Sequence, residues 1–268
     1  LAAALESFID PDGIATFPAW ETLPHERLSP RSDTVARRLA TLRRLAHPGD
    51  LPVRVLIMPV RSLLQPIPTG LGELEPVTAR MGMRIEMADF AHRLVDAAYT
   101  RVDMVTRRGE FAVRGGLIDV FAPTEPHPHR IEFFGDEIDE IRYFSAADQR
   151  SLEIAEDGVW APPCREILLT ESVRERARGL IDALPGAAEM LTKISEGIAV
   201  EGMESLAPAL VDSMESVVEH FPAGSLVILD DPERLRRRSH DLVATTGEFL
   251  AAAWTSAAAG ADAPLDLG

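Results

Sequence analysis

The sequence predicts an α/β scaffold that is interrupted by a smaller α+β domain with an antiparallel sheet. An amphipathic helix over 30–45, with proline in its first turn, precedes an almost continuous apolar run at 53–58. Such a run is typical of a buried parallel strand, and this order of helix and strand favours an α/β layer. Residues 66–76, rich in proline and glycine, then predict a domain boundary.

The middle of the chain has the pattern of a compact antiparallel unit. A helix near 87–97 carries one apolar stripe and precedes short β-rich segments separated by turn residues such as Gly135-Asp136. The predicted strands are 101–106, 110–114, 117–121, 130–134 and 137–144.

Helical patterns return after Pro162-Pro163, at 171–184 and 186–197. An apolar run at 225–229 predicts another strand, followed by a long helix for which Asp231 can serve as the cap. We therefore expect three segments. They are 1–70 for the first part of the α/β domain, 71–153 for the inserted domain and 154–268 for the second part of the α/β domain.

Composition excludes several classes of protein. No apolar run approaches the roughly 20 residues that span a bilayer, which excludes a membrane protein. The formal net charge of −16 argues against an independent nucleic-acid binder, because such binding depends on Lys and Arg neutralising phosphates. A single cysteine, Cys164, fits a reducing cytoplasm. The first residues include no initiator Met or basic leader, so we expect the start to be a cut within a longer protein.

The two-residue period of strands separates charged from apolar side chains in the middle unit. In the segment at 130, Arg130, Glu132 and Phe134 point to one side, whereas Ile131 and Phe133 point to the other. Phe134 is therefore an aromatic side chain on a polar face.

The segment at 110 repeats this division, with Glu110, Ala112 and Arg114 opposite an apolar pair. If both polar sets share one sheet face, Arg114, Arg130 and Phe134 form an arginine–aromatic cluster, a composition that is enriched in interface hot spots. The alternative is a solvated face with scattered ion pairs, each contributing about 0–1 kcal/mol.

Other reactive residue types lack the spacing that catalysis or metal binding requires. The only lysine, Lys193, follows no glycine loop, so the chain has no Walker A motif. His127 and His129 flank a proline without nearby ligands, and Cys164 has no local histidine. Asp119, Asp136 and Asp139 have no common focus, and we interpret them as surface acids. We expect no catalytic, cofactor-binding or metal site.

Longer motifs extend through the middle of the chain. The main stretches are Arg107-Arg108-Gly109-Glu110-Phe111-Ala112-Val113-Arg114-Gly115, Ile118-Asp119, Arg130-Ile131-Glu132-Phe133-Phe134, Asp136-Glu137-Ile138 and Asp148-Gln149-Arg150-Ser151-Leu152-Glu153. In these stretches the sequence is similar to domain 2 of UvrB and, more closely, to the equivalent domain of bacterial transcription-repair coupling factors. Earlier in the chain, Trp20-Glu21-Thr22 and Ser29-Pro30 are similar to the coupling factors specifically.

The resemblance implies a partner and a set of contact residues. In that family the domain-2 sheet binds UvrA, the damage-recognition ATPase of nucleotide excision repair. The implied contacts are Arg101, Arg114, Arg130, Glu132 and Phe134. Ala112 stands where UvrB has a further arginine, which leaves one contact in doubt.

The resemblance also implies a degenerate P-loop-helicase-like scaffold, similar to UvrB domain 1, around the inserted domain. Residues 230–233 occupy the place of a magnesium motif and are interpreted as a helix cap. Only Tyr99 and Tyr143 are available for a tyrosine-rich DNA hairpin, so damage verification is not expected. Binding of ATP and Mg, RNA polymerase and DNA would belong to other domains. A C-terminal domain would mask the UvrA surface.

Two alternatives remain open on the sequence. One is an active UvrB-like ATPase or helicase subunit, and the other is an acidic scaffold without a role in UvrA binding.

Overall fold

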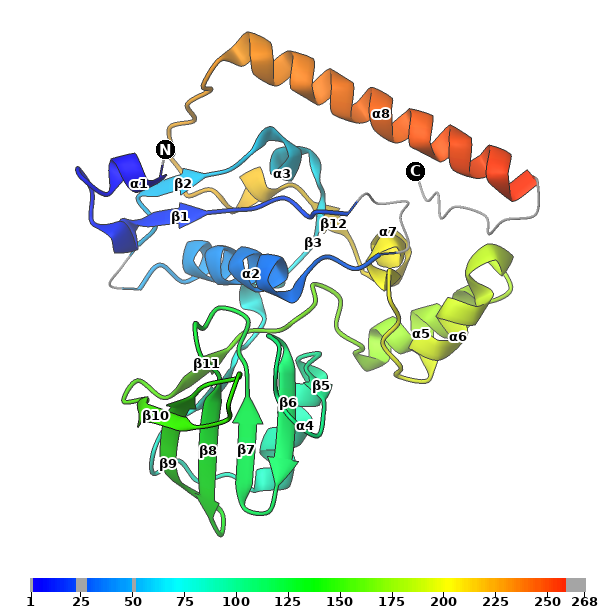
Figure 1. Cartoon of the computed structure of the whole chain (residues 1–268). Helices are drawn as coiled ribbons and strands as arrows, with labels where there is room; N and C mark the ends of the chain where they lie inside the picture. Colours follow the sequence, from blue (N-terminus) through cyan, green and yellow to red (C-terminus); the bar gives the residue numbers. More distant parts are fainter. Residues whose placement is uncertain (1, 23–27, 50–51, 259–268) are drawn as a thin grey trace.

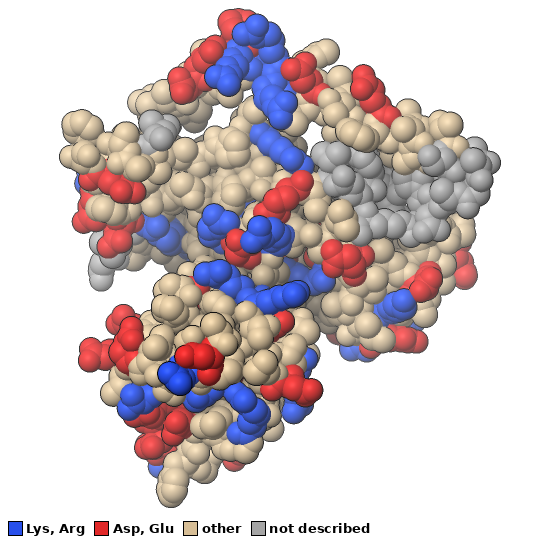
Figure 2. Space-filling model, in the orientation of Figure 1, with Lys and Arg blue, Asp and Glu red and all other residues tan. Residues whose placement is uncertain are grey.

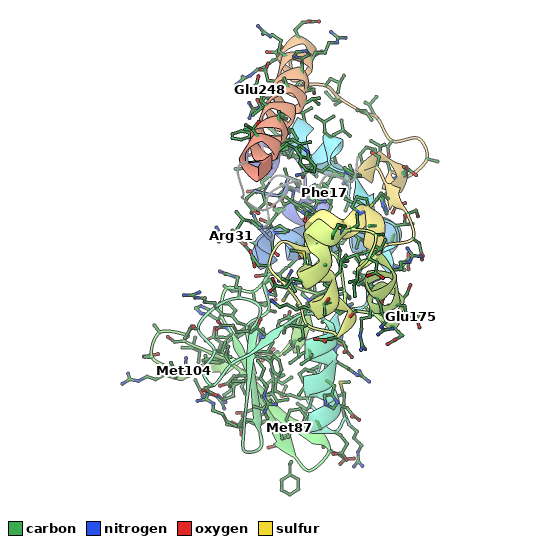
Figure 3. All side chains as sticks on the ribbon, turned by 90° about the vertical axis from the view of Figure 1, so that its right-hand side faces the viewer. Phe17, Arg31, Met87, Met104, Glu175 and Glu248 are labelled. Carbon is green, nitrogen blue, oxygen red and sulfur yellow. The ribbon has the colours of Figure 1, made fainter. Side chains whose placement is uncertain are left out.

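The structure is a computed structural model that describes residues 2–22, 28–49 and 52–258. An upper body of small sheets and helices joins a lower domain with one large sheet (Figure 1). Phe17 lies in the body, whereas Met87 and Met104 lie in the sheet domain (Figure 3). The mixed α/β class expected from the sequence is confirmed.

The body is built around helix α2, Ser32–Ala46, which packs against a parallel pair of strands, β1 and β2. The apolar residues of α2 join Phe17 and Val217 in one core, because their spacing places them on one helix face. The elements of this part are α1 Ala2–Leu5, β1 Ile14–Thr16, β2 Val55–Ile57, α3 Val60–Leu64, β3 Ile67–Pro68 and β12 Met214–Glu215, with 3-10 helices at Pro11–Gly13, Leu71–Glu73 and Val217–His220.

A second, helical core lies beside α2. Helix α5, Glu171–Leu180, packs against α6, Ala188–Ser195, and α7, Ala207–Leu210. Short 3-10 helices at Pro185–Ala187 and Met203–Leu206 connect them. The Thr170 hydroxyl caps α5 by accepting a hydrogen bond from the amide of Val173. Both helices predicted in this region are therefore confirmed.

The lower domain contains a six-stranded sheet in the order β10-β9-β8-β7-β6-β5. Helix α4, Met87–Asp96, covers one face, and its Phe90 and Leu94 are fully buried in the domain core. The strands are β5 Thr100–Arg101, β6 Glu110–Arg114, β7 Leu117–Val120, β8 His129–Phe134, β9 Glu137–Phe144 and β10 Ser151–Ile154. All pairs are antiparallel except β5–β6, which is parallel.

Strands β4, Val77–Ala79, and β11, Val159–Ala161, pair with each other at the neck of this domain. Its core extends from Val77 to Cys164, so β11 lies after the limit expected at residue 153. The amide of Cys164 donates to Ala97 O at 2.9 Å, and Ser32 Oγ of the body donates to Arg108 O at 3.4 Å. The first bond lies within the sheet domain, and the second links the start of α2 to that domain.

Two expectations about the scaffold are wrong. The run 225–229 forms no strand, because no strand edge pairs with it, and Leu226 is 85% exposed. Strand β2 is parallel as expected but only half-buried, since its sheet has two strands and one covering helix. The long helix predicted after the run 225–229 is present as α8, Pro232–Ala258. The cap is confirmed, because Asp231 Oδ1 accepts from the amide of Arg234.

Candidate docking face

The candidate site is the face of the six-stranded sheet that points away from α4. We call it the outer face, and Figure 1 views it with α4 behind the strands. Its side chains fall into two rows across the strands, because residues in register project to the same side. The rows are Ala112, Asp119, Arg130 and Arg142, then Arg114, Leu117, Glu132 and Glu140. Figure 2 shows acidic and basic side chains interspersed over this domain.

Asp119 joins the two arginines that the sequence brings to this face. Arg130 Nε donates to Asp119 Oδ1 at 2.8 Å, and Arg130 Nη2 donates to Oδ2 at 3.0 Å. Arg114 Nη2 also donates to Oδ2. The Asp119 side chain is only 1% exposed, so its charge is desolvated and compensated by both guanidinium groups. We call this set the Asp119 network.

Arg130 is held by contacts within the domain. Its guanidinium lies 4.7 Å from the centroid of the Phe144 ring, and Nη1 lies 3.4 Å from Gln149 O and 3.5 Å from Ser151 Oγ. The hydrogen bond with Asp119 raises the pKa of Arg130. Its side chain is 14% exposed, so little of its cation is available to a partner.

Arg114 stands further out, with 44% of its side chain exposed. It is the last residue of β6, and only its Nη2 donates within the Asp119 network. A guanidinium group has five N–H donors in a planar fork, so Arg114 retains donors for a carboxylate outside the domain.

Phe134 is 82% exposed at the end of β8. A two-residue turn follows, in which Gly135 adopts a φ of +67° that favours glycine. The preceding Phe133 packs on the other face against Phe90, at 6.2 Å between ring centroids, so alternation places Phe134 on the outer side with Arg130 and Glu132. The predicted sharing of one face by Arg114, Arg130 and Phe134 is therefore present.

Glu132 lies half-buried between its register partners Leu117 and Glu140. Glu140 is paired with Arg142, whose Nη2 donates to Glu140 Oε2 at 2.9 Å. This hydrogen bond lowers the pKa of Glu140. The outer face is thus a mosaic of both charges rather than a basic patch.

Arg101 is placed apart from the other four candidates. It is exposed on the short edge strand β5, and its register partner is Phe111, whose side chain is buried on the face covered by α4. The next residue, Val102, packs with Ala112 on the outer face. Alternation therefore starts the Arg101 side chain from the opposite side of the sheet.

The sequence interpretation missed Asp119, which it treated as a surface acid; the structure shows that this is wrong. The signal was present, because period-two alternation from Ile118 places Asp119 on the charged face and the hairpin Gly115-Gly116 sets it near Arg114. Asp136 and Asp139 are exposed, as expected.

Other candidate reactive groups are inaccessible or already occupied. Burial raises the pKa of the Cys164 thiol to about 12, which disfavours a nucleophilic thiolate. A cavity of about 300 Å³ in the body is lined by segments 68–74, 166–173 and 210–213, and no arginine or lysine is among its described lining residues. Its Glu166 is already paired with Arg38.

Within the described parts of the chain, no group of three or more His, Cys, Asp or Glu side chains could hold a metal ion. A separate search of the same residues finds no helix with the length and apolar character needed to cross a membrane.

Comparison with known proteins assigns the sheet domain to a family. Residues 77–163 match the family model described as the UvrB interaction domain. This match contains all five predicted contact residues and the Asp119 network. It also coincides closely with the core that extends from Val77 to Cys164.

Curated relatives match beyond this domain. The chain is 50% identical over 284 residues, covering 100% of the chain, to the transcription-repair-coupling factor of Mycobacterium tuberculosis (strain CDC 1551 / Oshkosh). The factor of Myxococcus xanthus is 33% identical over 87% of the chain, and that of Escherichia coli (strain K12) is 31% identical over 78%. The chain spans 23%, 21% and 18% of these three relatives, respectively. The chain belongs to the transcription-repair-coupling factor family.

Proposed function

We propose that the outer face recruits UvrA, and that this chain is the N-terminal, UvrB-like module of a transcription-repair coupling factor. The observation that carries the proposal is the exposure of Arg114 and Phe134 on the sheet face that also holds the Asp119 network, within the part that matches the UvrB interaction domain. An exposed ring and an arginine with unused donors on one face are the composition of an interface hot spot.

The chemistry of the face indicates what the partner surface must offer. Phe134 requires an apolar recess on the partner, because transfer of its 82% exposed ring out of water lowers the free energy of the complex. Arg114 requires a carboxylate or carbonyl oxygen, and Glu132 requires a donor. A nucleic-acid backbone fits less well, since the outer face also presents Glu132 and Glu140.

Equilibrium binding of the purified chain to purified UvrA tests the proposal. We expect submicromolar association, weakened at least tenfold by Phe134→Ala and by Arg114→Ala. Val95→Ala, on the exposed side of α4, is the matched control for the loss of an exposed apolar side chain. Arg93→Ala on the same helix is the control for the loss of an arginine. Absence of association, or equal weakening by the control variants, would contradict UvrA docking at this face.

The remaining activities are proposals about other parts of the protein. ATP and Mg would serve an ATP-dependent DNA translocase motor that displaces stalled RNA polymerase, and this fragment would be catalytically inactive. A C-terminal domain would mask the outer face until the protein engages polymerase. A full-length protein that binds UvrA as tightly as this chain would argue against masking.

An active ATPase or helicase subunit is less favoured as a function of this chain. The described lining of the 300 Å³ cavity has no cationic side chain for phosphates. Saturable binding of a fluorescent ATP analogue to the isolated chain would support that alternative and count against a pure docking role.

A further inference from the structure

Within the proposed UvrA-binding function, we infer that Asp119 is a positioning residue that gives the two arginines different roles. Arg130 braces the sheet from within, and Arg114 makes the direct contact with the partner. The inference rests on the proposed function and adds to it a role for Asp119, which the sequence interpretation treated as a surface acid.

The count of donors supports a bracing role for Arg130. Its Nε and Nη2 both donate to Asp119, its Nη1 lies within reach of Gln149 O and Ser151 Oγ, and its cation rests on Phe144. A partner could recruit this guanidinium only by displacing these contacts. At 14% exposure, most of the side chain is out of reach.

Arg114 differs in each of these respects. Only Nη2 is engaged, and 44% of the side chain is exposed. Without an anchor, a long side chain at the end of a strand would sample several rotamers, and binding would have to restrict them. The hydrogen bond to Asp119 restricts them beforehand, so the remaining N–H donors are aimed before the partner arrives.

The buried carboxylate also determines the charge that a partner meets. One negative charge lies between two positive charges, so the network carries a single net positive charge. Removal of the Asp119 charge would therefore make the outer face more basic while releasing Arg114. These two effects act in opposite directions on binding to an acidic partner surface, which makes the sign of the change informative.

The decisive variant is Asp119→Asn in the 268-residue chain, measured by equilibrium and kinetic binding to purified UvrA. Asn keeps the shape and one acceptor oxygen of the side chain. It removes the negative charge that pairs with the guanidinium groups of Arg114 and Arg130. We expect binding to weaken about tenfold, chiefly through faster dissociation. Glu189→Gln is the control, because it removes one negative charge that is paired with a cation, Lys193, on α6 of the body and outside the outer face. We expect that control to bind within about twofold of the unchanged chain.

A double-mutant cycle separates positioning from a general loss of structure. In the Arg114→Ala background, Asp119→Asn should cause little further loss of affinity, because no guanidinium remains to be aimed at the partner. Thermal unfolding monitored by circular dichroism confirms that each variant is folded at the temperature of the binding assay. If the Asp119→Asn substitution unfolds the domain, Arg114→Lys provides the second test. It retains the charge but loses the planar fork, and should weaken binding to a similar degree.

The outcomes distinguish the inference from the function on which it rests. If the unchanged chain does not bind UvrA, the proposed function fails and the inference fails with it. If the unchanged chain binds and Asp119→Asn binds equally well or more tightly, only the positioning role of Asp119 is overturned. A fully additive loss in the double variant would likewise overturn it.

Discussion

Two arginine–carboxylate networks in this molecule use the same chemistry for different ends. In the body, Arg38 and Glu166 both have fully buried side chains, with Arg38 Nε donating to Glu166 Oε1 at 2.5 Å. Trp20 Nε1 donates to the same oxygen at 3.0 Å, and the guanidinium lies 4.3 Å from the centroid of the Phe17 ring. In the sheet domain, Asp119 is equally buried, but its partner Arg114 reaches solvent.

The difference lies in where the unused donors point. Arg38 Nη1 is satisfied by Pro18 O, so this network joins α2 to two other chain segments and presents no group to a partner. The Asp119 network has one arginine inside and one outside. A buried ion pair can therefore take part in the proposed docking only where one member retains accessible donors. This criterion separates the Asp119 network from the Arg38–Glu166 network.

Breaking the body network should have the largest effect on stability. Arg38→Met leaves the Glu166 carboxylate buried without a cation, and we expect the free energy of unfolding to fall by about 3–5 kcal/mol. Urea unfolding followed by tryptophan fluorescence measures it. Arg37→Met is the control, since Arg37 is exposed and pairs only with Asp33 within the same helix. Similar losses in the two variants would remove the structural distinction that we draw for Arg38.

A titration near the Asp119 network should give the next largest effect. His129, the residue before Arg130, is buried beside Tyr143 with both ring nitrogens unpaired, and burial lowers its pKa from 6.5 to about 4. The unfolded chain protonates His129 below pH 6.5, whereas the folded chain does so only near pH 4. Stability from this group is therefore present above about pH 6.5 and is lost as pH falls, by on the order of 3 kcal/mol.

Unfolding free energies of the unchanged chain and of His129→Phe between about pH 7 and pH 4 isolate this effect. The Phe variant should lose less stability across that window. His127→Phe, which alters an exposed histidine two residues earlier, is the control for replacement of an imidazole by a phenyl ring. Parallel curves for the unchanged chain and the His129 variant would argue against a neutral, desolvated imidazole.

Removal of Arg130, the inner arginine of the Asp119 network, should have an intermediate effect on stability. Arg130→Ala deletes charge-assisted hydrogen bonds from a buried carboxylate that retains Arg114, and we expect a loss of about 2 kcal/mol in the free energy of unfolding. Arg142→Ala, in register with Arg130 but more exposed, should destabilise the chain less. Thermal unfolding compares the two variants, and a reversed order would contradict a bracing role for Arg130.

The smallest effect on stability is expected for Phe134→Ala. Its ring is 82% exposed and contributes little to the folded core, so the free energy of unfolding should change by less than about 0.5 kcal/mol. Its neighbour Phe133 packs against Phe90, and Phe133→Ala should destabilise the domain by several times more. If Phe134→Ala were as destabilising as Phe133→Ala, Phe134 would belong to the core rather than to the exposed outer face.

Local patterns predicted much of the inserted domain. The helix predicted at 87–97 and four of the five strands predicted for this domain appear close to their expected bounds. Alternating apolar residues and glycine turns specify a half-buried antiparallel sheet. The fifth shrank to Thr100–Arg101, and the edge strand β10 was not predicted. Edge strands lack one neighbour and depend on irregular pairing, which alternation within a short segment does not reveal.

The scaffold was less predictable because its contacts join distant segments. The apolar run at 225–229 has strand-like composition, yet composition does not provide the neighbouring edge with which a strand must pair. Arg38 and Glu166 are separated by 128 positions, and no local pattern connects them. The same limit applies to Arg101, whose assignment to the docking set came from resemblance and which lies apart from the other four.

The amino-acid sequence alone determined which side chains of each inserted strand face outward, since successive residues of a strand point to opposite sides. It also determined the family resemblance, through motifs long enough to be specific. Only the tertiary structure decided that Asp119 is buried between Arg114 and Arg130, and which of the two arginines remains accessible. Burial and pairing depend on how strands align across the sheet, and that alignment is a property of the assembled domain.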